Sequence, residues 1–447
     1  MNESLTDRLA RLRREGKGAS RGERGRQGIP ERERHAALPV WLRKKMEART
    51  ARGAAERSAE GSGAGARRAG LPEGLERHSN ERGGFLARTR RFPATHLHGE
   101  GSLADAFAIV PADTAILARD PGLAAFDARR AIYLDVETTG LSGGAGTTSF
   151  LVALGTFEAD TFVLWQGFLE GPEQESAMLA DVAARVAAAD CVVSFFGKSF
   201  DRHRLEDKMR MHAVAPPFED RGHLDLYHPL RRLYGGCFED TRLQTMEREL
   251  CGVVRPHDLP GRFAPEAWLD FLGGRAHRLE EVFQHNQDDV LSLVTLTAHL
   301  GRALLGSRPD GGALPGPGEP RRFGAAKLVA EAGELERALA LCEGLEDREA
   351  RFLRARLLAK LGRFESAFRE QVRLAEGERD RLALRAAIEA SKIAEHALGR
   401  PDDALVTCRR ALELAAVVLP GGSRGREERE LRHRESRLLR RRSCLER

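Results

Sequence analysis

The chain has 447 residues, of which 41% are hydrophobic and 31% are charged, and its net charge is +5. This length exceeds one ordinary domain and predicts two or three folded units, with enough apolar residues for a packed core. No stretch approaches the roughly 20 apolar residues of a membrane span, so a membrane protein is excluded.

Six cysteines lie at positions 191, 237, 251, 342, 408 and 444, and none forms a C-x-x-C pair. This spacing predicts neither a zinc knuckle nor a redox dithiol, and so few cysteines in a long chain do not form a disulfide framework. Charges interrupt every short apolar run near the N-terminus, so we expect no secretory signal. These features predict a cytoplasmic protein in a reducing compartment.

Residues 1–91 are expected to be a disordered basic tail. Residues 1–70 hold 18 Lys and Arg against 9 Asp and Glu, and the Gly/Ala/Ser run 61–66 cannot build a core. A short apolar patch at 38–42 before basic residues is either a transient helix or a docking segment. The tail either contacts a polyanion, nucleic acid being the first candidate, or only keeps the protein soluble.

Residues 92–305 are expected to form an α/β domain with a mixed sheet and flanking helices, because strands with a hairpin come first and then alternate with helices. From Leu224 onward the pattern is mostly helical. The expected strands are 131–136, 149–154, 161–165 and 191–196, and the expected helices are 178–189, 201–211 and 279–300.

A Gly/Pro-rich linker at 306–322 leads to an Ala/Leu-rich helical region at 323–418. A short motif, in which Gly is followed five residues later by Ala, occurs three times and begins at Gly333, Gly362 and Gly399. Its spacing brackets the 34-residue period of tetratricopeptide-like helix pairs, in which Gly would make the turn and the small Ala would let helices approach. An ordinary helical bundle is the alternative. Residues 419–447 are expected to be an Arg-rich tail or a frayed helix.

The first expected strand carries two acidic residues, Asp135 and Glu137. Residues two apart on a strand point to the same face, and two carboxylates projecting together from an apolar strand need positive charge. A divalent ion is the usual solution, and oxygen ligands favour Mg²⁺ or Mn²⁺. A solvated strand end is the alternative.

Two more acidic residues extend this pattern. Asp201 follows the fourth strand and opens a helix, where it either presents a carboxylate or caps the helix. His285 and Asp289 are four residues apart and share one face of a helix, whereas Asp288 is rotated by about 100° and is expected to face water or cap a basic neighbour. A surface His–Asp pair is the alternative for 285 and 289. Near Asp201, the cations Lys198, Arg202 and Arg204 either contact phosphates or form a solvated helix face.

Taken together, the phrases 134–144, 197–201, 258–261 and 285–293 resemble the DEDD superfamily of exonucleases. They are similar above all to a bacterial ribonuclease-H-like family of predicted exonucleases, some of which carry C-terminal tetratricopeptide-like repeats. The resemblance covers about residues 96–300. Better-studied branches have a His five residues, or a Tyr four residues, before the last Asp, whereas here His285 occupies the Tyr spacing. Gly197 stands near a position where many relatives have Asn.

The resemblance implies a two-metal phosphodiesterase that removes nucleotides in the 3′ to 5′ direction from DNA or RNA, with a single-stranded end as substrate. It implies that Asp135, Glu137, Asp201 and Asp289 hold two Mg²⁺ or Mn²⁺ ions, and that His285 accepts a proton from water or orients it. One alternative is an inactive scaffold whose repeats at 323–418 bind a protein partner. Another is a ribonuclease-H-like endonuclease that acts on junctions or RNA–DNA hybrids.

Overall fold

The computed structural model describes residues 71–140, 147–256, 258–304 and 318–445. The stretch 1–70, including the apolar patch 38–42, lies outside the described residues, so the disordered basic tail stays a prediction there. Five of the six cysteines, all except Cys444, have described thiol groups, and these five thiols are free. Within the described ranges no helix is both long enough and apolar enough to cross a membrane.

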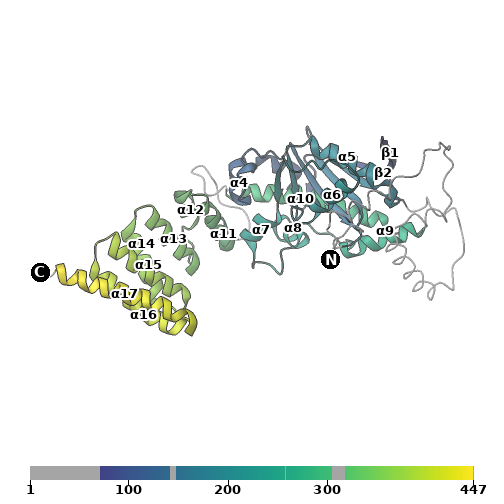
Figure 1. The fold of residues 1–447 in the computed structure, drawn as a ribbon. Helices are drawn as coiled ribbons and strands as arrows, with labels where there is room; N and C mark the ends of the chain where they lie inside the picture. Colours follow the sequence, from purple (N-terminus) through teal and green to yellow (C-terminus); the bar gives the residue numbers. More distant parts are fainter. Residues whose placement is uncertain (1–70, 141–146, 257, 305–317, 446–447) are drawn as a thin grey trace, which may run out of the picture. The chain divides into compact units, whose positions relative to one another are not determined.

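A mixed sheet of seven strands organises residues 75–225 (Figure 1). In chain order its strands are β1 (Leu75–Asn80), β2 (Gly83–Pro93), β5 (Ala131–Thr138), β6 (Ser149–Glu158), β7 (Thr161–Phe168), β8 (Cys191–Ser194) and β9 (Gly222–Asp225). Their spatial order is β1-β2-β7-β6-β5-β8-β9. Neighbours from β1 to β5 are antiparallel, whereas β8 is parallel to β5 and β9 is parallel to β8. A separate two-stranded sheet joins β3 (Leu97–His98) to β4 (Gly101–Ser102).

The long helix α10 (Leu279–Arg302) packs against β5 and β6. Gly155 of β6 permits the close approach, because a Cβ atom there would lie 2.8 Å from Cγ1 of Val290. Tyr133 pairs with Gly155 across the two strands and belongs to the same buried cluster as Val290. Since alternate residues of a strand share a face, Asp135 and Glu137 also point toward α10.

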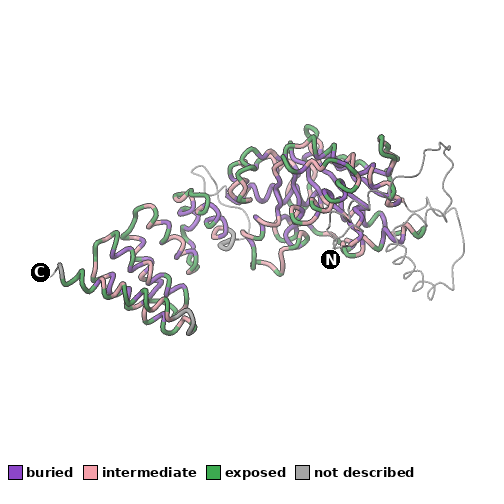
Figure 2. The backbone as a smooth tube through the Cα atoms, in the orientation of Figure 1, coloured by how far each residue is buried: buried purple, intermediate pink, exposed green. Residues whose placement is uncertain are grey.

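Shorter helices surround the sheet and complete the core. They are α4 (Pro111–Ala118), α5 (Glu175–Ala187), α6 (Asp201–Met211), α7 (Tyr227–Tyr234), α8 (Leu243–Cys251) and α9 (Ala264–Leu272). Buried residues run along the central strands and α10 (Figure 2). The strands expected at 131–136, 149–154, 161–165 and 191–196 and the helices expected at 178–189, 201–211 and 279–300 are all present, with ends shifted by a few residues.

One sequence expectation about this region was wrong. Residues 75–91 are not part of a disordered tail, because β1 and β2 extend the sheet beyond β7, and Phe85, Leu86 and Ala87 are buried there. The segment from Leu224 is mostly helical, as predicted, but the short strand β9, which ends at Asp225, forms a parallel edge strand beside β8. Its four residues are too few to show a strand periodicity.

Helices α11 (Gly318–Glu331), α12 (Leu335–Leu341), α13 (Arg348–Lys360), α14 (Phe364–Glu376), α15 (Arg381–His396), α16 (Pro401–Val418) and α17 (Gly421–Leu445) make up the C-terminal region. Each helix from α11 to α16 packs on the next in sequence. Gly333, Gly362 and Gly399 have φ values of 90°, 75° and 65° in the turns within successive pairs. The alanines five residues after them are fully buried, namely Ala338, Ala367 and Ala404. The predicted place of this Gly in a turn is therefore confirmed, and the Ala after it is buried between helices, where a small side chain fits.

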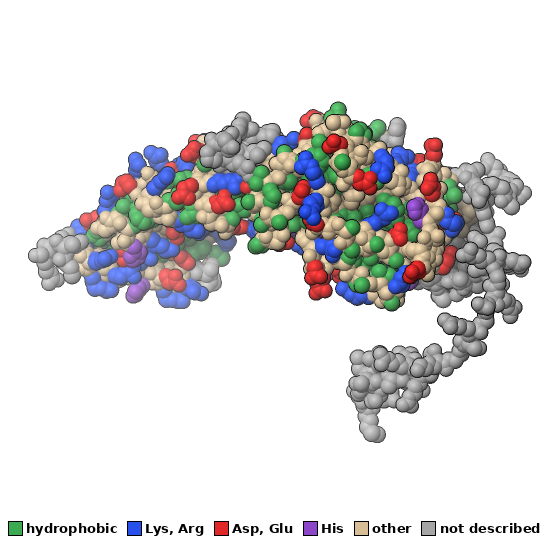
Figure 3. Space-filling model, turned by 90° about the horizontal axis from the view of Figure 1, so that it is seen from above, with side chains coloured by type: hydrophobic (Ala, Val, Ile, Leu, Met, Phe, Trp, Pro, Cys, Tyr) green, Lys and Arg blue, Asp and Glu red, His purple; other side chains and the backbone are tan. Residues whose placement is uncertain are grey.

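The expected boundaries of the linker and of the C-terminal tail need correction. Part of the linker, 305–317, lies outside the described residues, but 318–322 already belong to α11. The part of the expected tail that the structure describes, from 419 to 445, contains a packed helix, because Leu431 and Leu438 of α17 are buried. Its Arg437 donates to the buried carboxylate of Glu395 at 2.8 Å. On the face seen in Figure 3, basic and acidic side chains are interspersed over the helical region, so that face carries no single-sign field.

Candidate active site

The site begins at the end of β5, which carries Asp135 and Glu137 toward α10. The residues before them, Ile132 to Leu134, are buried, so the strand is anchored in the core up to the first acid. The pairing of β5 with β6 shifts register between Glu137 and Thr138. Such an irregularity ends regular pairing and re-aims side chains at a sheet edge. Both carboxylates are half-buried.

A chain of buried amide side chains fixes the orientation of Asp135. Asn286 of α10 donates from Nδ2 to Asp135 Oδ2 at 2.6 Å. Its own Oδ1 accepts from Gln166 Nε2 at 2.9 Å, and Gln166 Oε1 accepts from Arg88 Nη2 at 3.0 Å. Arg88, Gln166 and Asn286 are all almost fully buried. Asn286 lies in the segment 285–293 that resembles the exonuclease family, but sequence reasoning gave it no role.

The third acid, Asp201, is the first residue of α6 and is buried. The residue at the N-cap position is Phe200, so Asp201 is not the helix cap that the alternative interpretation expected. Burial, together with the nearby carboxylates of Glu137 and Asp225, raises the pKa of Asp201 to about 8. The loop before α6 therefore directs this carboxylate inward.

Asp225, which sequence reasoning missed, holds that loop in place. It ends β9, is buried, and accepts from the backbone N–H of Phe196 at 2.7 Å and of Lys198 at 3.0 Å. The only sequence signal was an acid after the short apolar run of β9. By tying down residues 196–198, Asp225 sets where α6 begins and where Asp201 projects.

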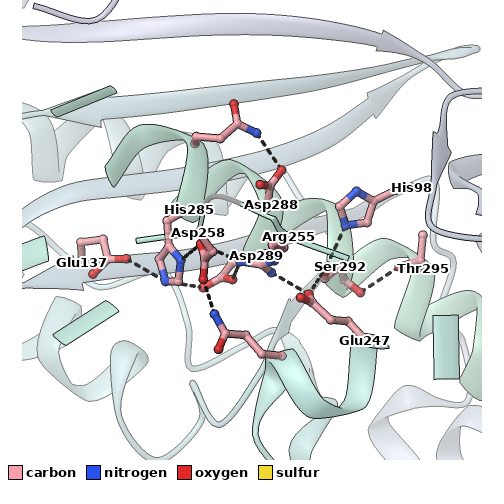
Figure 4. A network of polar contacts seen from close by, with 12 residues as sticks. His98, Glu137, Glu247, Arg255, Asp258, His285, Asp288, Asp289, Ser292 and Thr295 are labelled. Atoms are coloured by element: carbon pink, nitrogen blue, oxygen red, sulfur yellow. Dashed lines mark hydrogen bonds and ion pairs between the residues drawn. The ribbon is translucent and has the colours of Figure 1, made fainter. Parts of the chain in front are cut away.

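Helix α10 supplies the fourth acid and the histidine (Figure 4). His285 Nδ1 lies 2.6 Å from Asp258 Oδ1, while its Nε2 faces Asp289 Oδ2 at 3.5 Å and Glu137 Oε1 at 3.9 Å. The predicted shared face of His285 and Asp289 is thus present. Asp288 points elsewhere, but it is half-buried and accepts from Gln284 at 2.8 Å. It therefore bonds to a neutral amide rather than to a cation, while part of its surface stays exposed to solvent.

A buried arginine from the segment after α8 completes the network in Figure 4. Arg255 Nη1 lies 2.7 Å from Asp289 Oδ1, and its Nη2 lies 2.6 Å from Glu247 Oε2. Glu247 also accepts from Ser292 Oγ, which in turn contacts His98 Nε2 at 2.8 Å. Arg255 carries no recognisable local motif, so sequence reasoning missed it.

The electrostatics of the site show that its carboxylates crowd one another. Burial and the charges of Asp289 and Asp201 raise the pKa of Asp135 well above its ordinary value. Burial and Asp135 likewise raise the pKa of Glu137 to about 8. Each rise means that ionisation is unfavourable without added positive charge.

His285 is affected in the opposite direction. Burial alone lowers the pKa of His285, but the charge of Asp289, the hydrogen bond that His285 donates to Asp258 and the charge of Glu137 outweigh burial and raise this pKa to about 10. The surrounding acidic groups therefore favour the protonated form of its imidazole.

The donor chemistry of the four carboxylates fits hard divalent cations such as Mg²⁺ or Mn²⁺. Nevertheless, among the described residues no three His, Cys, Asp or Glu side chains are arranged so that they could hold a metal ion as they stand. Asp289 faces Arg255 instead. Metal binding would thus require the carboxylates to turn toward a common point, and Asp289 to loosen its contact with Arg255.

The cations near Asp201 are engaged within the protein. Lys198 Nζ lies 3.3 Å from Asp120, and Arg202 Nε lies 2.7 Å from Glu206. The Arg204 guanidinium lies over the ring of Phe200 at 5.2 Å. Contacts of these three side chains with phosphates therefore stay a prediction.

Comparisons of the sequence with known proteins bear on the fold. Residues 132–301 match the RNase_H superfamily. The mixed sheet flanked by helices fits an RNase-H-like fold. The chain is also similar to "Uncharacterized protein YprB" of Bacillus subtilis (strain 168), with 28% identity over 343 residues that cover 74% of this chain and 81% of the relative. The similarity to that relative therefore extends beyond the matched domain.

Proposed function

We propose that this chain is a metal-dependent nuclease, and specifically an exonuclease that hydrolyses phosphodiester bonds of DNA or RNA in the 3′ to 5′ direction. The superfamily match supports a nuclease-like function. The observation that carries the proposal is the convergence of Asp135, Glu137, Asp201 and Asp289 from three separate elements, with the pKa of Asp135, of Glu137 and of Asp201 raised. The exonuclease class and its polarity rest on the resemblance to DEDD exonucleases.

We further propose that these four carboxylates hold two Mg²⁺ or Mn²⁺ ions. Bound ions would activate water and stabilise the leaving oxygen in such a hydrolysis. Asp135 is the best placed to serve as a shared ligand, because Asn286 fixes one of its oxygens at 2.6 Å. Asp289 would exchange its contact with Arg255 for one with an ion.

His285 is proposed to handle the proton of the attacking water. Asp258 fixes its Nδ1, which leaves Nε2 directed at the carboxylates. When positive charge neutralises those carboxylates, the pKa of His285 falls toward its ordinary range, because the charges that raise it are compensated. Nε2 can then accept a proton, as a general base requires.

The experiment that tests the proposal is a time course on a single-stranded oligonucleotide, labelled at the 5′ end in one set and at the 3′ end in another. A 3′ to 5′ exonuclease gives a descending ladder with the 5′ label and immediate release of a mononucleotide with the 3′ label. Internal cuts would indicate an endonuclease. No cleavage with Mg²⁺ or Mn²⁺ would favour the inactive scaffold.

The helical C-terminal region is proposed to be a tetratricopeptide-like repeat array that binds a protein partner through residues 323–418. Support comes from the three left-handed glycines in the turns and the buried alanines after them. Stacked helix pairs of this kind present an extended surface to partners. We also propose that the protein acts in the cytoplasm, because its cysteine pattern predicts a reducing compartment.

A further inference from the structure

The loop that leads into α6 contains an aromatic residue with an unusual backbone. Phe196 has φ of 61°, in the left-handed region. A bulky side chain rarely adopts this region, and such outliers gather at functional sites when their surroundings enforce them. Here the enforcing group is Asp225, which accepts the backbone N–H of Phe196 and of Lys198. The backbone is therefore fixed by a buried carboxylate rather than by packing of the Phe196 ring.

The ring of Phe196 faces outward. The residue is 45% exposed, whereas its neighbour Phe195 packs against the core. One edge of the Phe196 ring meets Tyr227, with ring centroids 4.9 Å apart and an interplanar angle of 72°. Tyr227 therefore supports the ring from one side and leaves another side open to solvent. Core packing does not explain a strained and half-exposed phenylalanine.

The loop that carries this ring lies next to the candidate active site. A Cβ atom on Gly197, the next residue, would lie 3.1 Å from Asp201 Oδ2. Near the loop lies a polar pocket of about 180 Å³ whose lining includes Lys198, His228 and Arg232 together with the acidic residues Asp120 and Asp225. The pocket also contains His223, which is 3% exposed and whose Nδ1 has no hydrogen-bond partner among the described residues.

We propose that Phe196, backed by Tyr227, is the stacking platform for an unpaired nucleobase of the substrate. Proteins hold single strands on aromatic side chains of this kind, because every base offers a face for stacking. The inference rests on the proposed nuclease function and adds its substrate class, a strand with a splayed base beside Asp201.

The test uses the full chain carrying Asp135→Asn, in EDTA, so that binding is measured without cleavage. The probe is a single-stranded oligonucleotide with 2-aminopurine at its 3′ end. Two substitutions are compared in this background, Phe196→Asn and Phe196→Trp. Asn is enriched in the left-handed region, so Phe196→Asn relieves backbone strain and should raise the melting temperature. It should nevertheless weaken binding about 5- to 150-fold, the range for loss of one stacked base.

Phe196→Trp keeps a stacking face and should bind within a few-fold of the parent, with 2-aminopurine quenching retained. Unchanged affinity and unchanged quenching in Phe196→Asn would overturn the proposal while leaving the nuclease assignment intact. If Phe196→Asn and Phe196→Trp both lower the melting temperature, the ring has a packing role, and this result would also overturn the stacking proposal. If the parent protein binds no oligonucleotide, the proposed function itself fails.

Discussion

Arg255 Nη1 lies 2.7 Å from Asp289 Oδ1, and the same guanidinium contacts buried Glu247. One arginine thus neutralises the carboxylate that α10 brings to the candidate active site and a second one on α8. The charges of Asp289 and Glu247, together with the hydrogen bond that Arg255 donates to Glu247, raise the pKa of Arg255 even though burial lowers it, so the guanidinium stays charged. In this arrangement the Arg255 guanidinium supplies positive charge beside Asp289, one of the carboxylates proposed to bind a metal ion.

We predict that Arg255→Met destabilises the metal-free protein by about 3–5 kcal/mol, the usual effect of removing one partner of a buried ion pair. Denaturant unfolding in EDTA measures it. The matched control is Arg248→Met on α8, whose arginine is half-exposed and pairs with exposed acids. That change should leave the free energy of unfolding almost unchanged, because exposed ion pairs contribute little to stability. Equal effects of the two changes would show that Arg255 is not a buried neutralising group.

A second prediction separates two adjacent acids on α10. Asp289→Asn should abolish cleavage and weaken Mn²⁺ binding, because this side chain faces Glu137 and His285 across the site. Asp288→Asn should stay active, because Asp288 bonds to Gln284 and lies off that face. Isothermal titration with Mn²⁺ and single-turnover cleavage measure the two effects. The reverse pattern, with Asp288→Asn inactive, would show that the metal-binding face of α10 is misassigned.

Sequence reasoning located β5, β8, α6 and α10 because each has a strong local signal, an apolar run or a helical repeat. It failed for β2, where Arg88 is buried in the sheet, because a charged residue in a strand normally signals exposure. Arg88 is tolerated there because Gln166 and Glu280 satisfy its guanidinium. No local rule could have supplied that compensation.

The candidate site was predictable to a similar degree. Asp135, Glu137, Asp201 and Asp289 follow from motif spacing, and the structure brings them together. Arg255 and Asp225 act through contacts with residues about 30 positions away in the chain, and no spacing rule links such positions. The charge state of His285 also depends on Asp258, which approaches it from a different loop.

A third prediction concerns proton transfer by His285. His285→Ala should lower the cleavage rate by roughly two to four orders of magnitude, the usual contribution of a general base, and should remove the acidic limb of the pH–rate profile. His285→Gln should lose as much, because an amide can hydrogen-bond water but cannot accept its proton. Single-turnover rates across pH give the answer. A Gln variant close to the parent rate would reduce His285 to a residue that orients water.

The raised pKa of Glu137 and that of Asp201, both about 8, predict how metal binding depends on pH. Between about pH 4 and pH 8 the metal-free fold binds more protons than the unfolded chain, so these two groups reduce its stability as pH rises. Bound Mn²⁺ replaces the protons and removes this loss. The increase in melting temperature caused by Mn²⁺ should therefore grow from pH 5 to pH 8. An increase that is the same at every pH would contradict the raised values.

The most direct test of the metal-dependent site is the single-turnover cleavage rate of the parent, Asp135→Asn and Asp207→Asn with Mg²⁺ or Mn²⁺. Asp207 is a matched control on α6, with a side chain that is 68% exposed. The account predicts that the parent and Asp207→Asn cleave a single strand only when the metal is present. Asp135→Asn should be slower by about a thousandfold or more, because losing a metal ligand removes several kcal/mol of transition-state stabilisation. Full activity in EDTA, or in Asp135→Asn, would contradict it.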